Sequence, residues 1–152
     1  MFKNVLCPVD GSPESLEAAR VALDLARKYG GRLRLVHVVP LYLIDLLSNR
    51  VSLSEVDLLP REVEERLANE GRGFLDKIFT ELGSAEEVTC QLLEGAPGEV
   101  ICTAAEDSDV VVMGSRGRGR LSGLLLGSVS QYVLSHCGRP VLILPRPRSA
   151  SS

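Results

Sequence analysis

The sequence predicts one α/β domain built on a parallel β-sheet with helices on both faces. Short apolar runs of strand length alternate along the chain with segments whose apolar residues recur at helical spacing. The run Val110 to Met113 has no polar alternation, which indicates a strand buried on both faces, as in parallel sheets. The chain has 152 residues, 45% hydrophobic and 24% charged, which suffices for one core but not for two.

The first strand and the first helix follow directly from local signals. Val5 to Val9 is apolar and of strand length. Ser12 suits a helix N-cap, Pro13 fits the first helical turn, and Glu14 is favoured by the helix dipole. We expect this helix to end near Tyr29-Gly30-Gly31. Its apolar positions, three or four residues apart, are Leu16, Ala19, Leu23 and Ala26.

A second strand, a long helix and a third strand are expected next. The second strand covers Leu33 to Val39, and Val88 to Leu93 alternates as the third. Between them, a helical pattern is weakened by Gly71 and Gly73, because glycine is unfavourable in a helix interior. The apolar positions of this helix are Val63, Leu67, Phe74, Leu75, Ile78 and Leu82.

The C-terminal part completes the alternation of strands and helices. Pro97 opens a short helix that runs through Ala104-Ala105. Val110 to Met113 is the fourth strand, Ser128 to Cys137 the last helix, and Val141 to Leu144 the fifth strand. Such an alternation calls for right-handed crossovers between parallel strands, five strands in all.

Two segments do not fit this alternation. Residues 41–59 are apolar but lie between core elements. We expect either a helical elaboration packed over the sheet edge or a lid or docking surface, since a large apolar patch marks an interface. The serine-rich tail, residues 147–152, is expected to be disordered.

Composition excludes several classes of function. The net charge of −3 argues against general affinity for nucleic acid, whose recognition needs an excess of basic residues. The start of the chain has no signal-peptide pattern, and no apolar run reaches the roughly 18 residues that a membrane span requires. We therefore expect a cytoplasmic protein without membrane insertion.

The four cysteines have no C-x-x-C spacing and lie mostly in apolar segments. This pattern predicts small buried side chains in a reducing compartment, and it does not resemble a metal site. The four are Cys7, Cys90, Cys102 and Cys137.

A glycine motif directly follows the fourth strand and is the most informative feature of the chain. Gly114 and Gly117 are followed, after nine residues, by Gly127-Ser128, where the last helix begins. Glycines let the backbone approach an anion, and a helix start offers unpaired N–H groups, so the expected ligand is a nucleotide. The spacing differs from both the Gly-Lys phosphate loop and the dinucleotide fingerprint. The alternative is that these glycines serve only turns and packing.

Together with four other segments, this motif resembles the universal stress protein family. The resemblance covers residues 2–146 and falls in the subgroup that keeps the ATP-binding glycine motif. It implies the strand order 3-2-1-4-5, a Rossmann-like fold of the adenine nucleotide alpha hydrolase type, and a nucleotide-binding domain over residues 1–146. The four segments are Asn4 to Ser12, His37 to Val39, Gly95 to Pro97 and Gly138 to Leu144.

The resemblance also implies a binding site. In the order 3-2-1-4-5, Asp10 and Gly114 face one crevice, where Asp10 would accept from a ribose hydroxyl or hold Mg²⁺ or Mn²⁺ on the phosphates. A turn or helix-capping role for Asp10 is the alternative. Pro8 and Val9 would line the pocket, and main-chain groups of Val38 would read the adenine edge. By the same resemblance, Met113, Gly114, Arg116 and Gly117 flank the ribose and phosphates, and Gly127, Ser128, Val129 and Ser130 supply N–H groups and hydroxyls.

Little in the sequence indicates catalysis. No base is evident beside the glycine motif, and His37 and His136 are expected to be structural. We therefore expect an ATP-binding regulatory or stress-response module with at most slow ATP hydrolysis. The alternatives are a genuine ATPase or phosphoryl or nucleotidyl transferase, and a nucleotide-independent dimeric scaffold.

The last strand predicts an oligomer. Val141 to Leu144 is apolar and lies at a sheet edge, whose unpaired backbone groups need a cover or a second copy. Because members of the family that this chain resembles pair there, we expect a homodimer through this strand. An additional, unknown protein partner is compatible with this dimer.

Overall fold

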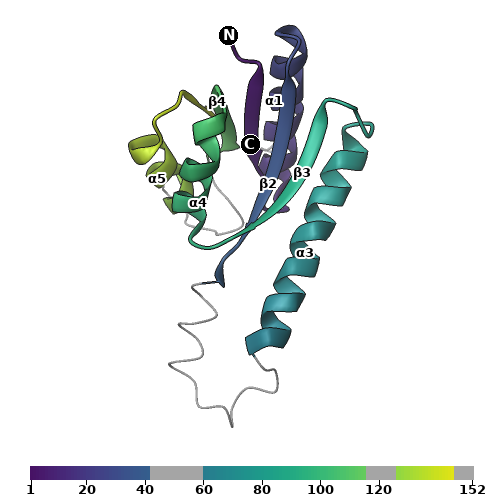
Figure 1. The fold of residues 1–152 in the computed structure, drawn as a ribbon, viewed down its shortest axis with the longest axis vertical. Coiled ribbons are helices and arrows are strands. Elements are labelled where there is room, and N and C mark those ends of the chain that lie inside the picture. The colour runs from purple at the N-terminus through teal and green to yellow at the C-terminus, as the bar shows by residue number, and fades with distance from the viewer. Residues whose placement is uncertain (42–59, 116–125, 146–152) are drawn as a thin grey trace, which may run out of the picture.

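The computed structural model describes residues 1–41, 60–115 and 126–145, and in these ranges one sheet of five parallel strands forms the centre of the molecule (Figure 1). The strands are β1 (Asn4–Pro8), β2 (Arg32–Val39), β3 (Val88–Glu94), β4 (Val110–Gly114) and β5 (Val141–Leu144). They lie in the order β3-β2-β1-β4-β5. The predicted α/β fold and strand order are therefore confirmed.

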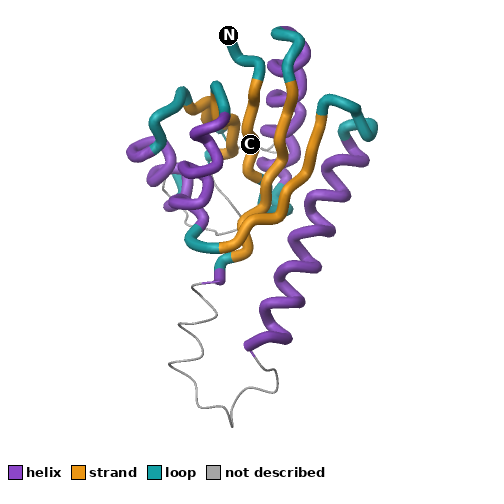
Figure 2. The backbone as a smooth tube through the Cα atoms, in the orientation of Figure 1, coloured by secondary structure: helices purple, strands orange, loops and turns teal. Residues whose placement is uncertain are grey.

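Helices cover both faces of the sheet. They are α1 (Pro13–Lys28), α3 (Pro60–Glu81), α4 (Pro97–Ala104) with the short 3₁₀ helix η1 (Ala105–Asp107), and α5 (Ser128–His136). Helices α1 and α3 pack on one face, and α4 and α5 on the other (Figure 2). Most of the expected insert, the tail, and the site candidates Arg116 and Gly117 lie outside the described residues.

The central strand β1 is buried on both sides. Val5 and Cys7 belong to the core beneath α1 and α3, whereas Leu6 between them belongs to the core beneath α4 and α5. This is the two-residue alternation of a strand, with apolar residues on both faces because the sheet is covered twice.

Helix α1 begins as the sequence predicts. Ser12 is its N-cap, and the Ser15 N–H donates to Ser12 Oγ over 3.2 Å. Pro13 occupies the first turn, and the helix ends at Lys28, directly before the expected Tyr29-Gly30-Gly31 stop.

Helix α3 is longer than its apolar pattern indicates, because it starts at Pro60 and its first turns reach past the strand ends (Figure 1). Gly71 lies in its interior, where the helix comes close to the sheet. A Cβ at this position would lie 2.5 Å from Cδ2 of His37 and 2.9 Å from Cδ1 of Leu92. Gly71 therefore costs helix propensity but permits the close approach of α3 to β2 and β3.

The cysteines differ in burial. Cys7 is fully buried in β1, as expected, and Cys102 and Cys137 are half-buried. Cys90 is exposed, so the prediction of a buried side chain is wrong there, because β3 is an edge strand with a neighbour on one side only.

Among the described residues, no helix combines the length and the apolar character that crossing a bilayer requires.

The close packing at Gly71 leads to a test with a matched control on the same helix. Gly71→Val is expected to lower the free energy of unfolding by about 1–3 kcal/mol, since overpacking at a site with fixed neighbours strains the structure. Gly73→Ala meets nothing within 4 Å and is expected to raise stability by about 0.5–1 kcal/mol through helix propensity alone. Urea denaturation measures both. Equal effects at the two positions would contradict the packing role of Gly71.

Candidate functional site

The carboxyl ends of β1 and β4 lie side by side at the centre of the sheet. The strands pair in parallel with Leu6 opposite Val111, and Val9 and Gly114 each follow three residues later. The helix after β1 packs on one face and the helix after β4 on the other. Ligands of open α/β sheets bind beyond the strand ends at such a reversal. The structure thus brings the end of β1, including Asp10, to the same edge as Gly114.

The turn after β1 uses one oxygen of Asp10. Asp10 Oδ1 accepts from the Ser12 N–H at 3.0 Å and from the Ser12 hydroxyl at 2.5 Å. Gly11 between them has φ +82°, and a Cβ there would lie 2.5 Å from the Phe74 ring. Asp10 therefore has the turn role that the sequence left as an alternative, while its Oδ2 has no partner in the described part of the chain.

The two ends of the glycine motif are joined at Ser115. The carbonyl of this buried residue accepts from the Gly127 N–H at 2.6 Å and from the Ser130 hydroxyl at 2.7 Å. The Ser115 N–H donates to the Leu144 carbonyl at 2.8 Å, which ties the junction to β5. The start of α5 is therefore held beside the end of β4. The Ser130 hydroxyl hydrogen is already used in this anchor.

Helix α5 presents free N–H groups at its start. Its first intrahelical bond joins the Gln131 N–H to the Gly127 carbonyl at 3.0 Å. Within the described residues, the N–H groups of Ser128, Val129 and Ser130 have no acceptor. The N-cap residue is Gly127, which has no side chain that could cap the helix. Such a helix start carries the positive end of the helix dipole and suits an anion.

The end of β2 borders the crevice on the other side of β1. Val38 is buried in the core beneath α4 and α5. Pro8 ends β1 and Val9 follows it directly, while Val38 lies in the adjacent strand β2 and Met113 in β4, which flanks β1 on its other side.

Both histidines have structural partners, as expected. His37 Nδ1 lies 2.7 Å from the Val9 carbonyl, and its ring meets Phe74 edge-on at a centroid distance of 5.4 Å. His136 Nδ1 lies 3.0 Å from the Tyr132 carbonyl, and the two rings stack.

The thiol of Cys7 in β1 is fully buried, and its surroundings disfavour the thiolate. Burial raises the pKa of the Cys7 thiol far above its usual range, and the negative charge of Asp10 raises it further. The thiol therefore stays protonated, whereas covalent chemistry needs the thiolate.

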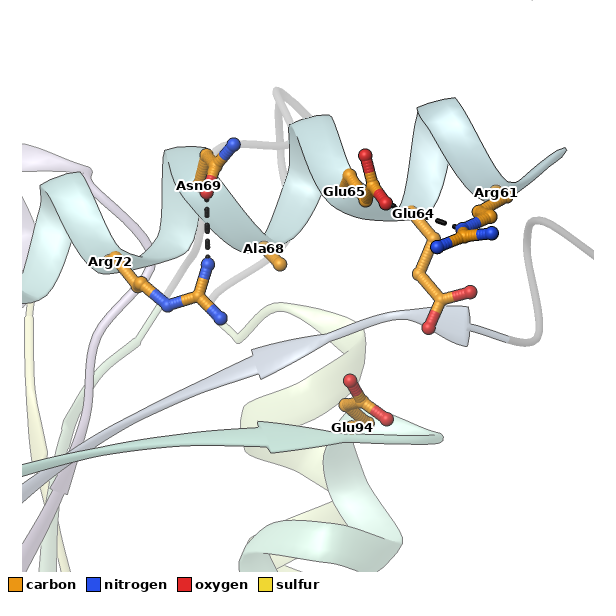
Figure 3. Close-up of a pocket in the computed structure, with 7 residues that line it drawn as sticks. All are labelled: Arg61, Glu64, Glu65, Ala68, Asn69, Arg72 and Glu94. Atoms are coloured by element: carbon orange, nitrogen blue, oxygen red, sulfur yellow. Dashed lines mark hydrogen bonds and ion pairs between the residues drawn. The ribbon is translucent and has the colours of Figure 1, made fainter. Parts of the chain in front are cut away.

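A hollow of about 540 Å³ lies between α3 and the carboxyl end of β3 (Figure 3). Its two arginines are already engaged: Arg61 pairs with Glu65 at 3.4 Å, and Arg72 donates to Asn69 at 2.9 Å. The hollow is thus lined mostly by polar and charged side chains, and both of its arginines have partners on the same helix. The two pairs within α3 follow from their sequence spacing, but the sequence does not show that α3 faces the end of β3. The residues that line the hollow are Arg61, Glu64, Glu65, Ala68, Asn69, Arg72 and Glu94.

Among the residues that the structure describes, no group of three or more His, Cys, Asp or Glu side chains could hold a metal ion.

Comparison with known proteins places the chain among characterised sequences. The universal stress protein family model matches residues 1–145. The universal stress protein MJ0531 of Methanocaldococcus jannaschii is 31% identical to this chain, over 97% of this chain and 85% of its own length. The universal stress protein MJ0577 of the same organism is 30% identical, over 98% of both chains. A Thermus aquaticus universal stress protein, from the 3′ region of a QAH/OAS sulfhydrylase gene, is 34% identical over 95% of this chain and 99% of its own.

Solved structures share the fold of this chain. The structure of MJ0577 superposes with a TM-score of 0.81 at 28% identity, over 98% of this chain and 99% of that one. A universal stress protein in complex with cAMP has a TM-score of 0.65 at 20% identity, over 95% and 97%. A universal stress protein from Archaeoglobus fulgidus in complex with dAMP has a TM-score of 0.61 at 20% identity, over 93% of this chain and 97% of that one.

The anchor at Ser115 can be tested by removing one hydroxyl. Ser130→Ala is expected to lower the free energy of unfolding by about 1–2 kcal/mol, because a buried hydrogen bond is lost. Ser135→Ala, on the exposed side of the same helix, is expected to change it by a few tenths, roughly the difference in helix propensity. Thermal unfolding compares the two. A Ser130→Ala protein as stable as its control would show that this bond does not hold the start of α5.

Proposed function

The chain belongs to the universal stress protein family, and on that premise we propose that it binds an adenine nucleotide, ATP, beyond the carboxyl ends of β1 and β4. The observation that carries this proposal is the start of α5, where three N–H groups without acceptors among the described residues are held beside the end of β4. An anionic phosphate chain is the ligand that such a helix start favours.

Each part of the nucleotide has a counterpart in the site. The phosphates would accept from the N–H groups of Ser128 and Val129, with Gly127 allowing the backbone to approach closely. We include Met113, Gly114, Arg116 and Gly117 in this part of the site. The free Oδ2 of Asp10 suits a ribose hydroxyl, while its Oδ1 keeps the turn in place.

The base has a place beside β1. Pro8 and Val9 line the floor of the crevice, and the main chain of Val38 offers a donor and an acceptor to the adenine edge. Two proteins with this fold hold the adenine nucleotides cAMP and dAMP, so the fold accommodates such ligands. Mg²⁺ or Mn²⁺ would bind chiefly through the phosphates, with Asp10 as the protein carboxylate that we propose as a ligand.

We propose a regulatory module in which occupancy changes stability and contacts. A ligand that binds only the folded state stabilises it by mass action. Rapid phosphoryl transfer needs a positioned base or water-orienting group, and we propose none here: the Ser130 hydroxyl donates to the Ser115 carbonyl, and His136 Nδ1 lies 3.0 Å from the Tyr132 carbonyl. ATP hydrolysis is accordingly at most slow.

We also propose a homodimer through β5. This strand is an edge of the sheet, with β4 as its neighbour on one side. Leu142 in the strand is 41% exposed although it is large and apolar. A second copy of the strand would pair the free backbone groups and cover this side chain.

The nucleotide proposal is tested by identifying what the purified protein carries and then titrating it. Mass spectrometry after denaturation is expected to release an adenine nucleotide, and calorimetry is expected to show ATP binding to stripped protein with and without Mg²⁺. Gly127→Val is expected to weaken ATP binding about 10- to 100-fold, because the side chain obstructs charge-assisted bonds to phosphate.

The matched control is Gly138→Val, since a Cβ at Gly138 meets nothing within 4 Å. It is expected to bind ATP as the wild type does. A wild-type protein that carries no nucleotide and binds none would mean that the glycine motif is structural and would favour the scaffold.

The dimer proposal is tested by placing charge on one sheet edge at a time. Leu142→Lys is expected to shift the protein to monomer in sedimentation velocity, because a buried like-charge pair would form across a two-fold interface. Thr89→Lys, at an exposed position on the opposite edge strand, is expected to leave the dimer intact. A dimer lost only in Thr89→Lys would move the interface to β3.

A further inference from the structure

The pairing of β1 with β2 stops one hydrogen bond early. Pro8 lies opposite Val36, and the Val9 N–H donates to the Val36 carbonyl at 2.8 Å. In a regular parallel ladder, the next bond would join the Val38 N–H to the Val9 carbonyl. That carbonyl instead accepts from His37 Nδ1 at 2.7 Å, which requires that Nδ1 carries the hydrogen.

Helix α3 holds the His37 ring in this position. Phe74 meets the ring edge-on, with an interplanar angle of 72°. Gly71 leaves the space that the ring occupies, since a Cβ there would lie 2.5 Å from Cδ2. Phe74 also packs against Gly11, so the same aromatic ring supports the histidine and the turn at Asp10.

The consequence falls on the main chain of Val38. Residues two apart on a strand direct their backbone groups to the same side, so Val38, like Val36, directs its N–H and C=O toward β1. β1 has ended there, and neither group has a partner among the described residues. Val38 is only 8% exposed, and buried backbone groups are rarely left unpaired.

We propose that His37 is a positioning residue that withdraws the Val9 carbonyl from the ladder and so reserves the Val38 N–H and C=O for the nucleotide base. This inference rests on the proposed nucleotide site and adds the source of its base preference. The Val38 N–H can donate to N1 of adenine, and the Val38 carbonyl can accept from the N6 amino group. Guanine carries the reverse pair, N1–H and O6, and is disfavoured.

Two amide variants separate hydrogen bonding from shape. In His37→Asn the side-chain amide nitrogen takes the place of Nδ1, whereas in His37→Gln it lies one bond further out. His37→Leu removes the donor altogether. We expect His37→Gln and His37→Leu to bind ATP about tenfold more weakly, the effect of one lost hydrogen bond, and to lose preference for ATP over GTP. His37→Asn is expected to keep both properties.

Tripolyphosphate, which has no base, provides the control ligand, and all three variants are expected to bind it as the wild type does. His37→Gln and His37→Leu proteins that keep the wild-type preference for ATP over GTP would overturn the inference. So would an equal loss of ATP and tripolyphosphate binding, because that pattern indicates a general loss of structure.

A measurement on the ligand-free protein tests whether His37 keeps the Val38 N–H out of the ladder. Amide hydrogen exchange by NMR is expected to show rapid exchange of the Val38 N–H in the wild type and slower exchange in His37→Leu, where the ladder bond to Val9 is free to form. A protected Val38 amide in the wild type would overturn the inference. Failure of the wild type to bind ATP contradicts the proposed function instead, and the exchange result then still establishes or refutes the role of His37.

Discussion

The burial of β1 on both faces is the constraint from which the rest of the architecture follows. A strand whose alternate residues all enter a core needs a layer of helices on each side, and the chain supplies these layers by winding in opposite directions from β1 and from β4. In open α/β sheets, ligands bind beyond the carboxyl ends of the strands at such a reversal. The candidate site is therefore a product of how the core is covered, and its location does not depend on any single polar residue.

Within the crevice, hydrogen bonds to backbone carbonyls determine which groups remain for a ligand. Ser115 accepts from Gly127 and Ser130 and so holds the start of α5, while the N–H groups of the first helical turn stay free of described partners. Asp10 divides its two oxygens in the same way between the turn and the open side. The structural roles of these residues therefore leave other atoms available for the proposed ligand.

Helix α3 connects the periphery of the fold to this site. Its glycine at position 71 weakens the helix locally, yet it admits the His37 ring, and Phe74 one turn later supports both that ring and the turn after β1. A local cost in helix propensity is thus offset by packing between elements. The hollow beside the first part of α3 is lined mostly by polar and charged side chains, unlike the ring contact between Phe74 and His37.

Periodicity in the sequence alone determined the strands, the helices and the Ser12 cap, because these depend on residues a few positions apart. The glycine motif likewise indicated the start of α5, where the structure places N–H groups without acceptors among the described residues. The tertiary structure decided what no local pattern records: the engagement of the Ser130 hydroxyl by Ser115, the diversion of the Val9 carbonyl by His37, and the exposure of Cys90 on an edge strand. Each of these depends on strand register and on how closely a helix approaches the sheet. Such contacts join residues far apart in the chain, so they exist only once the core has packed.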